Sequence, residues 1–183
     1  VNKANDISVM VNEEDHIRAQ CILPGKRLDE AYRRINDVDD MISAGNKIAF
    51  DPRLGYLTAC PTNVGTGMRA SALMFLPGLS LTHSLENCMN AVSRFDMTVR
   101  GEYGEGSDSE GYLYQVSNQK TLGLSEEDIL RNVSSAVDQI EKNEITARKA
   151  LLESNGTAVR DAIMRAYGVM TNAYALSAKE FME

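Results

Sequence analysis

The sequence has little of what marks several protein classes. Its 183 residues include only 4 prolines and 13 glycines and show no tandem repeat, which excludes collagen-like and low-complexity chains. No apolar run approaches the roughly 20 residues that a membrane-spanning helix needs, and no basic and apolar signal segment opens the chain. We therefore expect no membrane association.

Basic residues are also in deficit. Lysine and arginine number 19 against 26 aspartates and glutamates, which gives a formal net charge of -7. Nucleic-acid-binding proteins normally present a basic surface that displaces counterions, so the composition argues against a nucleic-acid partner. A local basic pocket is still compatible with an acidic chain.

Cysteine and histidine are scarce. Cys21, Cys60 and Cys88 are odd in number and lack CxxC spacing, so neither a disulfide framework nor a zinc ribbon is predicted. His16 and His83 are the two histidines, and no ligand-type spacing surrounds them, so no metal held by protein ligands is predicted. This usage is typical of a reduced, cytoplasmic protein.

The apolar content is sufficient for one folded domain. Hydrophobic residues make up 43% and charged residues 25% of the chain, as in ordinary globular proteins, and we expect a single domain over residues 1–183. The chain starts at Val1, and a capping-box pattern at Ser177 and Glu180 precedes the last residues. We therefore expect a fragment of a longer protein, with a frayed natural terminus as the alternative.

Periodicity divides the interior into strands and helices. Strands are predicted over residues 7–12, 17–22, 47–50, 56–60, 68–76, 97–100 and 112–116. Helices are predicted over residues 28–45, 85–95 and 125–171, the last with a break near Asn155. Because the strands lack a regular βαβ cadence, we expect an α+β fold. It would be a mainly antiparallel β-sheet flanked by helices, with a helical extension over about residues 125–183.

A loop rich in glycine and threonine spans residues 60–69, Cys-Pro-Thr-Asn-Val-Gly-Thr-Gly-Met-Arg. Such a loop can direct backbone N–H groups at an anion, with Arg69 at the start of the next strand. It is not a Walker A loop, because GxxxxGK[ST] is absent, and a tight connection is the alternative interpretation. Cys60 is either a reactive thiol whose pKa neighbouring arginines lower, or a buried small hydrophobe.

Two further segments concentrate charge. Residues 12–18 hold three acids, a histidine and an arginine, which a charged hairpin end would also explain. Residues 100–106 place an arginine at a strand end and a carboxylate five residues later, which a solvated acidic turn would also explain. Together, the three segments supply two kinds of group. The arginines that suit polyanion binding are Arg18, Arg69 and Arg100, and the acids that suit a cationic group are Glu14 and Glu105.

The same three segments resemble the signatures of one family. Residues 12–18 (Asn-Glu-Glu-Asp-His-Ile-Arg), 55–70 and 99–105 (Val-Arg-Gly-Glu-Tyr-Gly-Glu) are similar, in order and spacing, to those of ATP:guanido phosphotransferases. These are the phosphagen kinases, such as arginine and creatine kinase, and their bacterial relatives. Residues 114–127 and 165–169 resemble the bacterial protein arginine kinases, which phosphorylate arginine side chains in proteins and mark them for regulated proteolysis.

This resemblance implies a guanido-kinase, glutamine synthetase-like catalytic fold and phosphoryl transfer from ATP to a guanidinium group. Carried over by motif, the ATP phosphates are bound by Arg18, Arg69 and Arg100, with Mg²⁺ carried by the nucleotide. Glu105 is the implied base, Glu14 orients the acceptor guanidinium, and Cys60 lies beside it.

The sequence also departs from the family. An N-terminal part with a Ser-x-Arg-x-Arg strand is missing, so we expect this chain alone to transfer phosphate poorly. The resemblance implies ATP or ADP and proteins with exposed arginines as partners. An activator, a protease partner and a homodimeric full-length protein stay open. The alternatives are a kinase for a small guanidino compound such as arginine, and a non-catalytic regulatory domain that has kept the fold.

Overall fold

The computed structural model describes residues 1–93, 95–101 and 110–182. These residues form two compact units, each built from two segments of the chain. The first unit comprises Val1–Ser71 and Asn118–Ser134, and the second comprises Ala72–Ser117 and Ser135–Glu183. The long helix α4 begins in the first unit and continues in the second.

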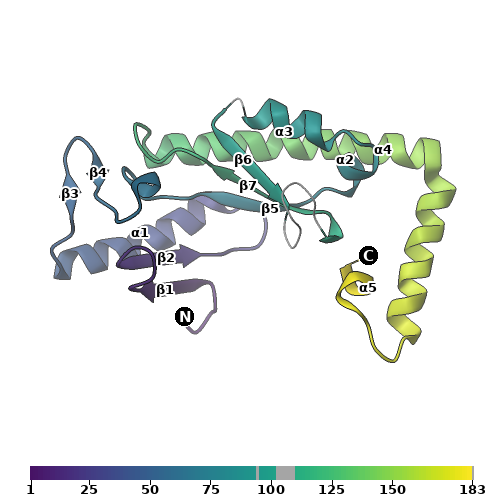
Figure 1. Ribbon diagram of the computed structural model, residues 1–183, viewed down its shortest axis with the longest axis horizontal. Helices are drawn as coiled ribbons and strands as arrows, with labels where there is room; N and C mark the ends of the chain where they lie inside the picture. Colours follow the sequence, from purple (N-terminus) through teal and green to yellow (C-terminus); the bar gives the residue numbers. More distant parts are fainter. Residues whose placement is uncertain (94, 102–109, 183) are drawn as a thin grey trace. The chain divides into compact units, whose positions relative to one another are not determined.

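A hairpin and a helix open the first unit. Strand β1 (Ile7–Val11) pairs antiparallel with β2 (Ile17–Cys21), and helix α1 (Leu28–Gly45) packs on β2 (Figure 1). Arg34 of α1 donates hydrogen bonds to the carboxylates of Asp6, just before β1, and of Glu30. The predicted hairpin and helix are therefore both present.

The rest of the first unit is mostly loop. Its short elements are β3 (Phe50–Asp51), β4 (Gly55–Tyr56) and the 3-10 turn η1 (Pro61–Asn63). The predicted strands over residues 47–50 and 56–60 are thus much shorter than expected. One reason is that the N–H groups of Ala59 and Cys60 donate to the Asp15 side chain instead of a neighbouring strand. The first turns of α4 bury Ile129 and Val133 completely.

A three-stranded sheet forms the centre of the second unit. Its strands are β5 (Ser71–Phe75), β6 (Met97–Gly101) and β7 (Leu113–Asn118), in the order β5-β7-β6. Backbone hydrogen bonds link Ala70 with Asn118 and Leu76 with Tyr112, so β5 and β7 run antiparallel. Val116 on the central strand is fully buried. Antiparallel strands with helices confirm the predicted α+β class.

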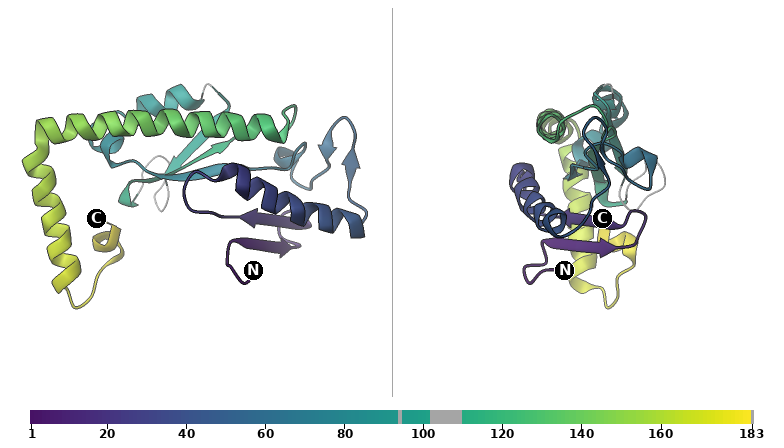
Figure 2. Two further views of the ribbon diagram at one scale, coloured as in Figure 1. Left: turned by 180° about the vertical axis from the view of Figure 1, so that it is seen from behind. Right: turned by 90° about the vertical axis from the view of Figure 1, so that its left-hand side faces the viewer.

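Helices accompany this sheet. They are α2 (Pro77–Leu81), α3 (Leu85–Ser93), α4 (Glu126–Asn172) and α5 (Ala178–Met182), with a 3-10 turn η2 (Glu110–Tyr112) before β7. Figure 2 shows the part of α4 before its break along one face of the sheet. Helix α3 lies beside α4, where the Asn143 amide contacts the Cys88 thiol at 3.5 Å. The predicted break in α4 is confirmed, since Asn155 leaves helical geometry at φ -131 and ψ 24.

Helix α2 is absent from the sequence-based prediction, which has a strand over residues 68–76 and no element directly after it. Pro77 does end the strand, but it also occupies the first turn of a helix, where proline is favoured. The buried carboxylate of Glu144 accepts the N–H groups of Gly78 and Leu79, each at 2.8 Å. This cap comes from a residue more than 60 positions away, so no local pattern announces it.

The C-terminal capping box is present as predicted. Ser177 accepts the Glu180 N–H at 3.2 Å, and the Glu180 carboxylate accepts the Ser177 N–H at 2.9 Å. A helix with the length and apolar character for crossing a bilayer does not occur in the part of the chain that the structure describes.

Candidate active site

The three acidic residues of the corner between β1 and β2 differ in their contacts and exposure. Asn12 adopts a positive φ of 55° and donates its N–H to the His16 carbonyl, which closes the turn. Glu13 accepts a hydrogen bond from Arg18 at 3.2 Å, and both side chains are about half exposed. The hydrogen bond from the Glu14 N–H is the main cause that lowers the pKa of Glu13, and the hydrogen bond from Arg18 also lowers it. Glu14 itself is exposed at the tip of the corner.

Asp15 joins this corner to the loop of residues 60–69. One carboxylate oxygen accepts the N–H of Ala59 at 2.6 Å and that of Cys60 at 3.4 Å. The other accepts the side-chain amide of Asn63 at 2.8 Å. The Asn63 hydrogen bond is the main cause that lowers the pKa of Asp15, and the two backbone N–H groups add to it. Asp15 is the residue that sequence reasoning missed, because it was grouped with its acidic neighbours.

Cys60 lies at the start of the loop and is partly buried. Its thiol contacts the Thr62 hydroxyl at 3.0 Å, and its carbonyl accepts the Thr58 hydroxyl at 2.7 Å. Asp15 therefore links the segments that hold two predicted site residues, because it follows Glu14 in the chain and accepts the N–H of Cys60. The role of Glu14 and Cys60 in binding the acceptor stays a prediction.

The far end of the loop is held by residues of the segment after β7. The buried Asn118 side chain accepts the Ala70 N–H at 2.8 Å and donates to the Met68 carbonyl at 3.0 Å. Thr121 donates its hydroxyl to the Val64 carbonyl at 2.8 Å. A Cβ on Gly65 would lie 2.3 Å from the Thr121 carbonyl oxygen, so this position requires glycine.

The idea that the loop surrounds an anion with its backbone N–H groups is not supported at most positions. The N–H of Gly65 donates to the Tyr56 carbonyl, and that of Thr66 donates to the Thr121 carbonyl. The Met68 N–H donates to the Thr66 hydroxyl. These donors are used to fold the loop, so they are not directed at an anion.

The predicted arginines lie on several elements. Arg18 is on β2 and Arg69 ends the loop, both exposed within the first unit. Arg100 is exposed on β6 in the second unit. Glu105 lies outside the described residues, so the structure does not test its place. Histidine, cysteine and carboxylate side chains do not gather in groups of three or more that could hold a metal ion anywhere in residues 1–93, 95–101 and 110–182.

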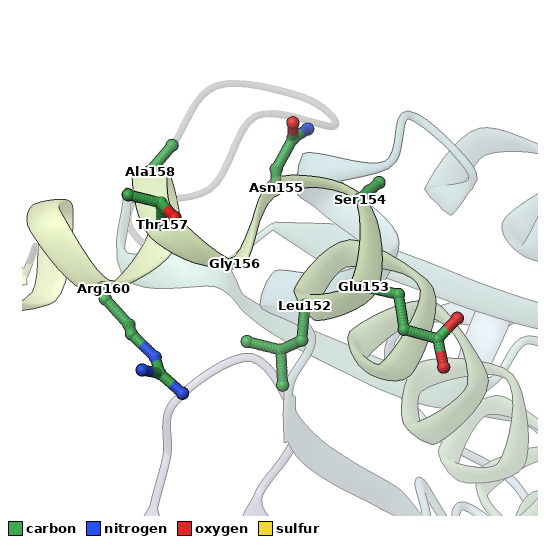
Figure 3. Close-up of a pocket in the computed structure, with 8 residues that line it drawn as sticks. All are labelled: Leu152, Glu153, Ser154, Asn155, Gly156, Thr157, Ala158 and Arg160. Atoms are coloured by element: carbon green, nitrogen blue, oxygen red, sulfur yellow. The ribbon is translucent and has the colours of Figure 1, made fainter.

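A concavity of about 550 Å³ lies along the break in α4, and none of the predicted site residues lines it (Figure 3). It is lined by eight residues of one continuous stretch of α4, between Leu152 and Arg160. Figure 3 shows the side chains of Glu153, Asn155 and Arg160 pointing in different directions, so they do not converge on a ligand. This hollow is a consequence of the helix break.

Comparison with known proteins points to one family. The family model described as ATP:guanido phosphotransferase, C-terminal catalytic domain, matches residues 1–147. Protein-arginine kinases of Caldanaerobacter subterraneus and Geobacillus stearothermophilus are 47% and 46% identical over 97% and 98% of this chain. The match covers 53% and 50% of those proteins, so the chain spans about half the length of the curated relatives it matches.

Solved structures agree with the sequence match. The substrate-free duplicated taurocyamine kinase of Schistosoma mansoni is 36% identical with a TM-score of 0.71, over 85% of this chain and 21% of that one. A lombricine kinase is 28% identical with a TM-score of 0.71, over 81% of this chain and 42% of that one. The similarity to the protein-arginine kinases extends further, since it continues beyond residue 147 into the end of the chain.

Proposed function

The chain belongs to the ATP:guanido phosphotransferase family, and from this we propose that the complete protein phosphorylates arginine side chains of other proteins with ATP. The observation that carries the choice of acceptor is the identity of 46% to 47% with protein-arginine kinases over nearly the whole chain. Glu14 of the corner and Cys60 of the loop are assigned to the acceptor side of such a site.

The acceptor explains why carboxylates are needed. A guanidinium group has a pKa above about 12, so its nitrogen is a poor nucleophile until a proton leaves. In the transfer, a nitrogen–phosphorus bond forms, the bond from the γ-phosphorus to the bridging oxygen of ADP breaks, and the proton passes to Glu105. Glu14 holds the planar guanidinium through charge-assisted hydrogen bonds. Cys60 is assigned a place beside the same guanidinium.

The nucleotide requires positive charge. Phosphoryl transfer depends mainly on positioning and on neutralising phosphate oxygens, and we assign this to Arg18, Arg69 and Arg100. Arg18 hydrogen-bonds to Glu13 in the structure, but an exposed pair of this kind is weak and a phosphate group can displace it. Magnesium is expected to bind the nucleotide phosphates, because Mg²⁺ is commonly held by substrate phosphates and water.

An assay that compares two acceptors distinguishes this function from its alternatives. The complete protein would be incubated with Mg·ATP and either an unfolded, arginine-containing protein or free L-arginine, and phosphoarginine would be measured by mass spectrometry. We expect the protein acceptor to be modified. Modification of free arginine alone would indicate a small-molecule kinase, and modification of neither would indicate a non-catalytic domain.

A substitution at the assigned base tests the mechanism in the same assay. Glu105→Gln keeps the size of the side chain but cannot accept the proton, so we expect transfer to fall by at least about 100-fold with folding intact. The matched control is Glu153→Gln, at an exposed position on α4. Equal activity of both variants would remove Glu105 from the mechanism.

The cellular setting is also a proposal. Cys21, Cys60 and Cys88 are all free thiols in the structure, which suits the reducing cytoplasm. We propose that arginine-containing proteins are the main macromolecular partners. An activator, a protease or a second copy of the complete protein would be identified by purification of the protein with its bound partners.

A further inference from the structure

Asp15 differs from the glutamates beside it in its hydrogen bonds to residues far along the chain. It accepts hydrogen bonds from Ala59, Cys60 and Asn63, which lie 44, 45 and 48 positions further along the chain. All three acidic residues of the corner carry the same charge, but Asp15 alone among them accepts a backbone N–H from Cys60 in the part of the chain that the structure describes. It is also less exposed than Glu13 and Glu14.

The rest of the loop has independent support. Asn118 holds Met68 and Ala70, and Thr121 holds Val64, so this end of the loop is fixed without Asp15. Loss of the Asp15 contacts would therefore leave the loop folded but remove the hydrogen bonds that join Cys60 and Asn63 to the corner. The relation between that end and the corner depends on Asp15 and its partner Asn63.

We propose that Asp15 is a positioning residue that fixes Glu14 relative to Cys60, and so sets the geometry of the acceptor subsite. The proposal rests on the proposed function. Glu14 is joined to Asp15 by one peptide bond, and Cys60 donates its own N–H to Asp15, so a single carboxylate determines the place of both. Transfer is sensitive to such placement, because a displacement of about 1 Å can cost about 100-fold in rate.

The hydrogen bond between Asp15 and Asn63 allows a test by exchange of the two side chains. Asn63→Asp places a second carboxylate against Asp15 where an amide donated, and the two charges repel. Adding Asp15→Asn restores an amide–carboxylate pair with the donor on the other side, while an oxygen at position 15 still accepts the Ala59 and Cys60 N–H groups. The single and double variants have the same side-chain sizes, so packing is held constant.

In the complete protein, we expect Asn63→Asp to lower kcat/KM for the protein acceptor by about 100-fold. The double variant should recover most of this loss. Binding of MgADP, measured by calorimetry, should stay unchanged in both, since neither Asp15 nor Asn63 is among the residues assigned to the nucleotide. A double variant no better than Asn63→Asp, or an Asn63→Asp variant with normal kcat/KM, would overturn the proposal.

A second measurement separates this inference from the proposed function. Hydrogen exchange of the Cys60 amide can be followed by NMR in the complete protein without any substrate. We expect exchange about tenfold faster in Asn63→Asp and near-normal exchange in the double variant. Unchanged exchange in Asn63→Asp would refute the role of Asp15, even with activity intact. Absence of arginine phosphorylation by the unaltered protein would refute the proposed function, whatever the exchange shows.

Discussion

At the scale of single residues, neighbouring glutamates of the acidic corner are expected to differ in function. Glu14 is assigned to the acceptor, whereas Glu13 hydrogen-bonds to Arg18. We expect Glu14→Gln to lower kcat/KM for the protein acceptor by about 100-fold, because a charge-assisted hydrogen bond is lost. Glu13→Gln should leave the acceptor KM unchanged and free Arg18 for phosphate. Steady-state kinetics with varied acceptor, and MgADP titration, distinguish the two. Similar losses in both variants would contradict the assignment.

Tyr56 gives a prediction on stability and pH. Its hydroxyl donates to the Asp39 carboxylate at 2.6 Å, and this bond, aided by burial, raises the pKa of Tyr56 to about 12. Because the folded pKa exceeds the ordinary value of 10, the neutral tyrosine stabilises the folded state fully below pH 10. This contribution should disappear as the pH rises through about 12.

The Tyr56→Phe variant provides the comparison. Urea unfolding at a series of alkaline pH values should show a decline in stability above pH 10 that is steeper for the natural protein than for Tyr56→Phe. Parallel declines would show that the contact with Asp39 is not maintained in solution.

At the scale of elements, helix α2 depends on one buried carboxylate. Glu144 accepts the N–H groups of Gly78 and Leu79 and also pairs with Arg148 at 2.6 Å. Glu144→Ala leaves two buried N–H groups without their acceptor, so we expect a loss of about 2 kcal/mol in unfolding free energy. The control Glu153→Ala, exposed on the same helix, should change it by less than about 0.5 kcal/mol. Chemical denaturation measures both, and equal effects would contradict the capping role.

Elements with strong local signals were predicted well. The β1–β2 hairpin, α1, α3 and the break in α4 follow from residue alternation, helical spacing and the Asn155–Gly156 pair. The prediction was poorer for β3 and β4, which are shorter than expected, and for α2, which was missed. Asp15 accepts N–H groups just after β4, and Glu144 accepts those at the start of α2, each from a distant part of the chain. Local patterns carry no information about such partners.

At the scale of the whole molecule, the length of the relatives bears on activity. The chain corresponds to about half of the protein-arginine kinases it matches. We expect the 183 residues alone to transfer phosphate poorly. The family resemblance implies further phosphate-binding arginines in a Ser-x-Arg-x-Arg strand, and these 183 residues do not include that strand. Comparing this chain with the complete protein in one phosphoarginine assay checks this. Equal rates would show that the 183 residues suffice.

Nucleotide binding can be tested in the chain itself. Calorimetric titration with MgADP should show binding that is lost or reduced at least about tenfold in Arg100→Ala, because a charged hydrogen bond to phosphate is removed. The matched control is Arg131→Ala, whose exposed side chain on α4 pairs with Asp128. Identical binding by all three proteins would show that the motif has been assigned the wrong role.

The sequence by itself determined the family and the α+β class, and it supplied the residues proposed for the site. Signature stretches and local periodicity are properties of neighbouring residues, so they can be recognised without a structure. Only the tertiary structure decided how the three acids of the corner divide their contacts: Glu13 bonds to Arg18, Asp15 to the loop, and Glu14 stays exposed. The reason is physical, since hydrogen bonds between residues 44 or more positions apart exist only once the chain path has brought them together.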